Sequence, residues 1–179
     1  MALNSTIYRF AIDLSDLDRG IYESKSVHVA LHPSETLERM VVRVLAYCLN
    51  YHERLEFTKG LSTDNEPELW QKSLSDEIEL WVEVGLPDAK RLKKANNQSR
   101  QTLVYAYGGQ GVENWWSTVS KQVGQSQRMR VFQVPLEPVE EFARQIERTM
   151  RISVMIQDGV INLSWDGAML ELSPQELGV

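Results

Sequence analysis

Alternating apolar and polar residues predict β-strands near the start of the chain. Every second residue from Tyr8 to Leu14 is apolar, a period of two that is typical of a strand with one buried face. A second short apolar run covers residues 27–31, and the polar segment Leu17–Gly20 suits a turn between the two runs. We therefore expect added strands at the N-terminus.

The end of the chain carries the clearest strand signal. Three alternating runs follow one another over residues 151–157, 160–164 and 168–172. They are separated by Asp158-Gly159 and Asp166-Gly167. Asp-Gly is favoured in two-residue hairpin turns because both residues of such a turn need positive φ. The pattern predicts a C-terminal antiparallel β-meander.

Helical and strand patterns alternate in the middle of the chain. Leu37, Val41, Val44 and Cys48 recur at helical spacing after Ser34, a favourable N-cap residue, and predict a largely buried helix. The other predicted elements are strands over 54–58, 77–84, 102–107 and 128–134, a helical turn over 67–72, and helices over 87–98, 112–119 and 139–149. Since no repeat or linker interrupts this order, it predicts a mixed α/β (α+β) fold with residues 1–179 as a single domain.

Composition and charge exclude several classes of protein. The chain has 179 residues and a net charge of −6, which argues against a surface coated with positive charge for duplex binding. Cys48 is the single cysteine, so no disulfide forms within the chain. The first residues lack a signal-peptide pattern, and the longest strongly apolar run, Val44–Leu49, is far shorter than the ~20 residues that cross a bilayer. We expect a cytoplasmic protein that does not bind membranes.

Charge is unevenly distributed around the predicted strand 77–84. Residues 64–83 hold seven acidic residues against one lysine, whereas residues 87–101 hold five basic residues against one aspartate. One interpretation is a solvated acidic face beside a solvated basic helix. The other is a site, because Glu83 ends a strand whose opposite face is apolar, and α/β folds place sites at the carboxyl ends of such strands.

Glu38 is a second candidate for a functional carboxylate. It falls in line with Val42 and Leu45 on the predicted helix, away from the polar stripe that contains Glu35 and Arg39. A carboxylate on a buried line needs a partner or a cation. The alternative is a first-turn glutamate that the helix dipole favours.

Five segments resemble one family of bacterial proteins. They are HPSETLERM (His32–Met40), RLEFTKGL (Arg54–Leu61), DNEPELW (Asp64–Trp70), IELWVEVGLPDAKRLKKA (Ile78–Ala95) and IQDGVI (Ile156–Ile161). Their order and content are similar to those of the YaeQ family, over nearly the whole chain. That family resembles the restriction-endonuclease-like superfamily, PD-(D/E)xK. The resemblance implies a core of one helix, three strands, a second helix and a further strand.

The resemblance also implies roles for particular residues. Glu38 corresponds to the acid from the first helix and Glu83 to the (D/E) of the motif, with either Glu68 or Glu79 as the first acid. Gly85 stands where the motif has its lysine. Some members of the superfamily supply the lysine from the next helix, and there Lys94 is the first candidate and Lys93 the second.

The implied function is that of a metal-dependent nuclease or phosphodiesterase. Glu68, Glu79 and Glu83 are the candidate ligands of Mg²⁺, with Mn²⁺ as a substitute, because hard cations prefer carboxylate oxygens. The basic helix could hold nucleic acid through Lys90, Arg91, Lys93 and Lys94. Gly85 favours an alternative, a nuclease-like module that binds nucleic acid or protein without catalysis.

Overall fold

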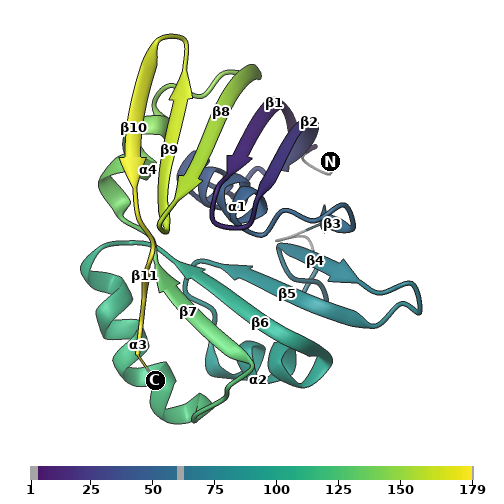
Figure 1. The fold of residues 1–179 in the computed structure, drawn as a ribbon. Coiled ribbons are helices and arrows are strands. Elements are labelled where there is room, and N and C mark those ends of the chain that lie inside the picture. Colours follow the sequence, from purple (N-terminus) through teal and green to yellow (C-terminus); the bar gives the residue numbers. More distant parts are fainter. Residues whose placement is uncertain (1–3, 60–62, 179) are drawn as a thin grey trace.

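Two β-sheets dominate the structure, a computed structural model that describes residues 4–59 and 63–178. Residues 60–62, which include the end of the segment RLEFTKGL, lie outside this description. Figure 1 shows the first sheet, built from both ends of the chain, beside the second sheet, built mainly from its middle. The mixture of helices with two mixed sheets confirms the α+β prediction.

The first sheet has the strand order β10-β9-β8-β1-β2. Its strands are β1 (Thr6–Asp16), β2 (Ile21–Leu31), β8 (Thr149–Gln157), β9 (Val160–Trp165) and β10 (Ala168–Leu172). β1 and β2 form an antiparallel pair, and β8, β9 and β10 form the predicted antiparallel meander. β1 also lies parallel to β8, with Arg9 opposite Thr149. This last pairing joins the two ends of the chain into one sheet.

Both meander turns have the backbone that Asp-Gly favours. Asp158 and Gly159 have φ of 52° and 74°, and Asp166 and Gly167 have φ of 42° and 78°. Left-handed φ costs an L-residue roughly 1–2 kcal/mol, and glycine escapes this cost because it lacks a Cβ. The two Asp-Gly pairs therefore reverse the chain between β8 and β9 and between β9 and β10.

The turn at Gly159 yields a stability prediction. Gly159→Ala is expected to lower the free energy of unfolding by about 1 kcal/mol, because alanine must adopt the left-handed backbone. Gly111→Ala is the matched control, since Gly111 lies in a helix and an added Cβ there meets no atom of the described residues within 4 Å. Urea titrations of both variants check this. Equal loss at the two positions would contradict it.

The second sheet has the strand order β11-β7-β6-β5-β4-β3. Its strands are β3 (Leu55–Phe57), β4 (Leu69–Lys72), β5 (Ile78–Val84), β6 (Ser99–Ala106), β7 (Met129–Gln133) and β11 (Gln175–Glu176). β5 runs antiparallel to β4 and parallel to β6, so it is an interior strand of the sheet. The prediction of a helical turn over 67–72 is wrong. Proline precedes helices and strands alike, and here Leu69 and Trp70 pair with Val82 and Trp81 of β5.

Four helices are assigned in the described residues. They are α1 (Leu37–Leu49), α2 (Ala89–Gln98), α3 (Gln110–Val123) and α4 (Leu136–Ala143). α1 is capped by Thr36, whose hydroxyl accepts from the Arg39 N–H at 3.2 Å, and not by Ser34 as predicted, since Ser34 bonds with His32. α4 ends six residues before the expected 149, because the Arg148 carbonyl accepts from the Arg9 N–H and draws the chain onto β1.

The helices separate into two layers around the second sheet. The larger core includes α1, α4 and buried residues of both sheets, whereas α2 and α3 pack against the other face of the second sheet. β5 is consequently buried on both faces, and its last four residues, Trp81–Val84, are all buried. In the part of the chain that the structure describes, no helix is long and apolar enough to cross a membrane.

Candidate functional site

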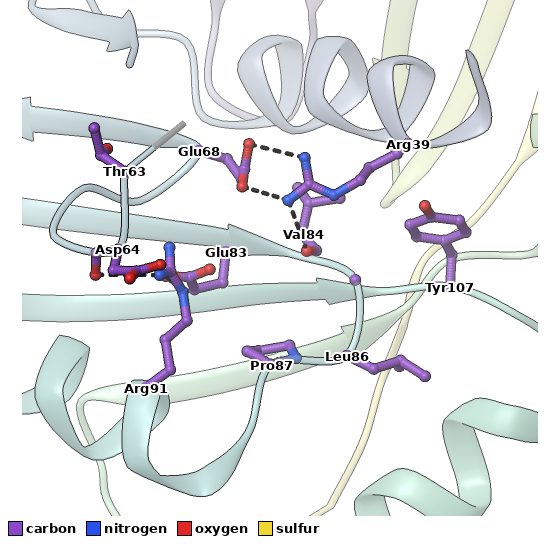
Figure 2. A pocket seen from close by; sticks show the side chains of 11 residues that line it. Arg39, Thr63, Asp64, Glu68, Glu83, Val84, Leu86, Pro87, Arg91 and Tyr107 are labelled. Carbon is purple, nitrogen blue, oxygen red and sulfur yellow. Dashed lines mark hydrogen bonds and ion pairs between the residues drawn. The ribbon is translucent and has the colours of Figure 1, made fainter. Parts of the chain in front are cut away.

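A pocket of about 500 Å³ opens at the carboxyl end of β5. Its walls come from α1, the segment before β4, the end of β5 and the start of α2 (Figure 2). The polar residues that line it are Arg39, Thr63, Asp64, Glu68, Glu83, Arg91 and Tyr107. The pocket thus lies at the edge of the sheet where the sequence placed a site.

Glu68 is the first buried carboxylate of the pocket. It immediately precedes β4, and its backbone N–H donates to the Val82 carbonyl at 2.9 Å, which fixes it beside the end of β5. Its side chain is about 2% exposed and accepts hydrogen bonds from both terminal nitrogens of Arg39, on α1. The Arg39–Glu68 pair therefore ties α1 to the second sheet across the pocket (Figure 2).

Arg39 belongs to a larger buried ionic cluster on α1. It donates to Glu35, four residues earlier on the predicted polar stripe, at 3.1 Å. Arg43 donates to both oxygens of Glu35 at 2.8 Å and lies 3.8 Å from Glu68. Glu35 and Arg43 are 2% and 4% exposed at the side chain, so these charges are compensated inside the protein instead of by water.

Glu83 is the second buried carboxylate. Its Oε1 accepts from the indole N–H of Trp81 at 2.7 Å and from Nε of Arg91 at 2.8 Å. Burial raises the pKa of Glu83 above its ordinary value, the hydrogen bonds from Arg91 and Trp81 act against this, and the negative charge of Glu68 adds to it. Glu68 and Glu83 therefore lie near enough to repel each other while each is neutralised by its own arginine.

Arg91 also shapes the wall of the pocket. Its terminal nitrogens donate to the carbonyls of Glu66 at 2.8 Å and Asp64 at 3.3 Å. The guanidinium thus connects α2, the segment before β4 and Glu83. The sequence placed Arg91 with the exposed lysines of the basic helix, but only about a quarter of its side chain is exposed.

The other two predicted acids are outside the described lining of the pocket. Glu79 accepts from Gln71 at 2.9 Å and pairs with Arg54 at 3.0 Å, four residues or roughly 13 Å along β5 from Glu83. Glu38 is half-buried in the first turn of α1 and is outside the set of described residues that line the pocket. The structure therefore brings Glu68 together with Glu83 and leaves Glu79 with Arg54, whereas Glu38 is near enough to Tyr107 of the pocket for its charge to raise the pKa of that phenol.

The lysines of α2 are outside the described lining of the pocket. Lys94 donates to Asn65 Oδ1 at 2.6 Å and to the Asp64 carbonyl at 3.3 Å, so it supports the segment before β4. Lys93 and Lys90 are exposed. Ala89, Leu92 and Ala95 form the buried face of α2.

Sequence reasoning missed the contributions of Arg39, Thr63 and Tyr107 to the pocket. Arg39 lies beside Glu35 on the predicted polar stripe, which gives no sign of a partner in another element. The excess of acidic residues over residues 64–83 could have identified it, because each carboxylate that becomes buried there needs a basic partner from another segment. Tyr107 follows β6 directly, at the same sheet edge as Glu83, and burial raises the pKa of its phenol.

The pocket contains oxygen atoms of the type that bind a hard divalent cation. Glu68 and Glu83 offer carboxylate oxygens, and the buried Thr63 hydroxyl has no hydrogen-bond partner in the described parts of the chain. Magnesium sites often use only one or two carboxylates, with water or phosphate completing the shell. As arranged, however, both carboxylates accept from arginines, and residues 4–59 and 63–178 hold no group of three histidine, cysteine or acidic side chains placed to bind a metal. A cation would therefore need the arginines to release the carboxylates.

Comparison with known proteins places the chain among its relatives. A model of the family described as YaeQ protein matches residues 1–174. The uncharacterized protein YaeQ of Escherichia coli (strain K12) is 39% identical over 173 residues, covering 97% of this chain and 96% of that protein. The uncharacterized protein YaeQ of Salmonella typhi is 38% identical over 164 residues, covering 92% and 91%.

Solved structures share the fold. The crystal structure of the YaeQ protein from Pseudomonas syringae superposes with a TM-score of 0.93 at 40% identity, covering 98% of this chain and 97% of that chain. The YaeQ protein from Xanthomonas axonopodis pv. citri gives a TM-score of 0.92 at 40% identity, covering 96% and 97%. With matches in sequence and fold along almost its full length, the chain belongs to the YaeQ family.

Proposed function

We propose that the chain is a divalent-cation-dependent phosphodiesterase acting on nucleic acid, built on a restriction-endonuclease-like core. The order of elements supports such a core: α1, the antiparallel strands β3, β4 and β5, then α2, then β6 parallel to β5. This is one helix, three strands, a second helix and a further strand.

One observation is the main support for the proposed activity. Glu68 and Glu83, each nearly inaccessible to solvent, line the same open pocket at the carboxyl end of β5. Burying two carboxylates near each other is costly unless they serve a cation or firm counter-charges. An open pocket beside them leaves room for a ligand, which a purely structural pair of ion bridges would not need.

Different residues of the pocket would bind the cation and the phosphate. Glu68 and Glu83 would hold Mg²⁺ or Mn²⁺, which polarises a phosphoryl oxygen and lowers the pKa of a bound water. Arg39 and Arg91 would hold the phosphate, because a guanidinium donates two parallel hydrogen bonds to it. Arg91 thereby takes the place of the motif lysine that Gly85 cannot supply. Lys90 and Lys93, exposed on the same helix, would contact the neighbouring phosphates.

Two measurements on the unmodified protein test this proposal. Calorimetric titration with Mg²⁺ and with Mn²⁺ should give saturable binding. Incubation with labelled single- and double-stranded DNA and RNA should give cleavage that EDTA stops. Absence of both binding and cleavage would overturn the proposal.

A second candidate function rests on the arginines themselves. Both carboxylates already accept guanidinium hydrogen bonds, so the site is electrically complete without a cation. This favours a nuclease-like module that binds nucleic acid or protein without cleaving it. Binding of nucleic acid at low salt that weakens as salt rises, with no cation binding and no cleavage, would select this alternative.

Arg91 gives a kinetic prediction for the phosphodiesterase. Arg91→Ala is expected to lower kcat/KM by about 10²-fold, the scale of losing one donor that stabilises developing charge. Lys93→Ala is the matched control, because Lys93 is an exposed cation on the same helix outside the described lining of the pocket, and the loss of its proposed contact with a neighbouring phosphate should lower kcat/KM far less. Steady-state cleavage rates of the two variants check this. A loss no greater for Arg91→Ala than for Lys93→Ala would contradict the assigned role.

A further inference from the structure

A second cavity, of about 310 Å³, lies where the two sheets meet. Its walls come from the β1–β2 turn, the end of α1, strands β6 and β7, the β8–β9 turn and the segment after β10. Figure 1 shows that segment passing from the first sheet to β11 of the second sheet. The cavity shares none of its described lining residues with the pocket around Glu83, and its volume is at the lower end of the range of ~300–1,000 Å³ for small-molecule sites.

The first feature that points to a ligand is the hydroxyl of Tyr105. Tyr105 is 4% exposed, and its oxygen accepts from Nδ2 of Asn50 at 2.8 Å. Burial raises the pKa of Tyr105 to about 12, so the phenol keeps its proton. Among residues 4–59 and 63–178, no group accepts that proton in a hydrogen bond. The hydroxyl therefore keeps a donor for an acceptor that enters the cavity.

The second feature is a pair of guanidinium groups at the same cavity. Arg19 is held by Asp16, by the Tyr51 carbonyl at 3.0 Å and by the Cys48 carbonyl at 3.2 Å. Arg130 is held by Glu176 through Nε and Nη2, at 2.9 and 2.8 Å. These bonds use three of the five N–H groups of Arg19 and two of those of Arg130. Both side chains are thus fixed in place and retain donors.

The third feature is the aromatic and aliphatic lining beside these donors. The ring of Phe132 stacks on that of Tyr105, with centroids 5.4 Å apart and an angle of 16° between planes. The guanidinium of Arg130 lies over the ring of Phe132, with its central carbon 5.0 Å from the ring centroid. Leu103 and Pro174 add further apolar lining. The cavity therefore combines donors for an oxyanion with a surface for a planar apolar group.

We propose that this cavity binds a small organic anion in which one carboxylate or phosphate monoester is attached to a planar apolar body. The oxyanion accepts from Tyr105, Arg19 and Arg130, and the apolar body lies against Phe132 and Leu103. A guanidinium fork matches carboxylate and phosphate geometry equally well, so the two head groups are separated by experiment. The proposal stands independently of the activity assigned to the first pocket.

Calorimetric titration with benzoate and with phenyl phosphate tests the proposal. At least one probe should bind saturably, and whichever binds more tightly identifies the head group. Benzyl alcohol, which keeps the ring and lacks the charge, should bind at least tenfold more weakly. Tyr105→Phe and Arg130→Gln should each weaken the better probe by about tenfold, since each removes a hydrogen bond to a charged group.

Lys121→Gln is the matched control, because it removes one positive charge from an exposed position on α3, away from the cavity. It should leave the affinity unchanged. Thermal unfolding measures whether each variant is folded. If Tyr105→Phe proves unstable, Arg130→Gln decides the test, because the Arg130 side chain is half exposed and its replacement disturbs the core less. The proposal is overturned if neither probe saturates below about 10 mM. It is also overturned if Arg130→Gln weakens binding no more than Lys121→Gln.

Discussion

Glu83→Gln is expected to reduce cation-dependent cleavage by at least about 10²–10³-fold while the fold is retained. The amide oxygen of glutamine still accepts from Trp81 and Arg91, so the packing at the end of β5 is preserved. The negative charge, which the proposed cation needs, is lost. Glu83→Ala is a poorer test, because it leaves the buried indole N–H of Trp81 without its acceptor, at about 1–3 kcal/mol.

The same variant has an expected effect on stability that does not depend on activity. Burial raises the pKa of Glu83 above its ordinary 4.5, so between these two pKa values the native state binds more protons than the unfolded state. The stability of the unmodified protein should therefore fall as pH rises through that window. Glutamine does not titrate, so Glu83→Gln should become more stable relative to the unmodified protein from pH 4 to pH 8.

Urea titrations at several pH values measure this difference. Glu79→Gln is the matched control, since Glu79 lies on the same strand at a partly exposed position, paired with Gln71 and Arg54, and hydrogen bonding to Gln71 lowers its pKa. For Glu79→Gln the trend should be reversed and confined to lower pH: the variant loses relative stability as pH rises toward the ordinary pKa of 4.5 and changes little above it. Cleavage that survives Glu83→Gln would remove Glu83 from the proposed site.

Arg39→Met is expected to lower the free energy of unfolding by about 3–5 kcal/mol. Methionine keeps the apolar bulk of the side chain, but Glu68 loses both of its guanidinium hydrogen bonds while it stays buried. Arg43, 3.8 Å away and already bound to Glu35, compensates only in part. The result is a buried carboxylate without an adequate counter-charge, one of the few causes of so large an effect.

An exposed ion pair supplies the control for this prediction. Arg100 pairs with Glu77, and both side chains are more than half exposed, so Arg100→Met should cost less than about 1 kcal/mol. The double variant with Arg39→Met and Glu68→Gln should recover part of the loss, because the uncompensated charge is gone. Equal denaturation midpoints for Arg39→Met and Arg100→Met would show that the Arg39–Glu68 pair contributes no more than a surface bridge.

The local elements were predictable because their signals are local. The meander of β8, β9 and β10 follows from period-two alternation and two Asp-Gly turns, and the buried faces of α1 and α2 follow from helical spacing. Where a local signal was ambiguous, the prediction failed: Pro67 suits the start of a helix as well as the approach to β4. Ser34 and Thr36 are both good caps, and only the contact of Ser34 with His32 separates them.

The candidate site was predictable in part. Glu83 could be placed from β5 alone, because strand alternation and the following glycine mark the end of a buried strand. Its partner could not, since Glu68 and Glu79 are equally plausible by sequence. The pairing of β4 with β5 decides between them by setting Glu68 beside the end of β5 and leaving Glu79 with Arg54.

The sequence by itself determined most of the strands and helices, though not β4, and which strand ends in a buried acid, because these depend on neighbours within a few residues. Tertiary structure alone decided that β1 pairs with β8 across the length of the chain and that Arg39 and Arg91, from different helices, meet Glu68 and Glu83. It also brought Arg19, Tyr105 and Arg130 to one cavity. The physical reason is that charge compensation and strand pairing act between groups close in space, and sequence periodicity carries no information about such distances.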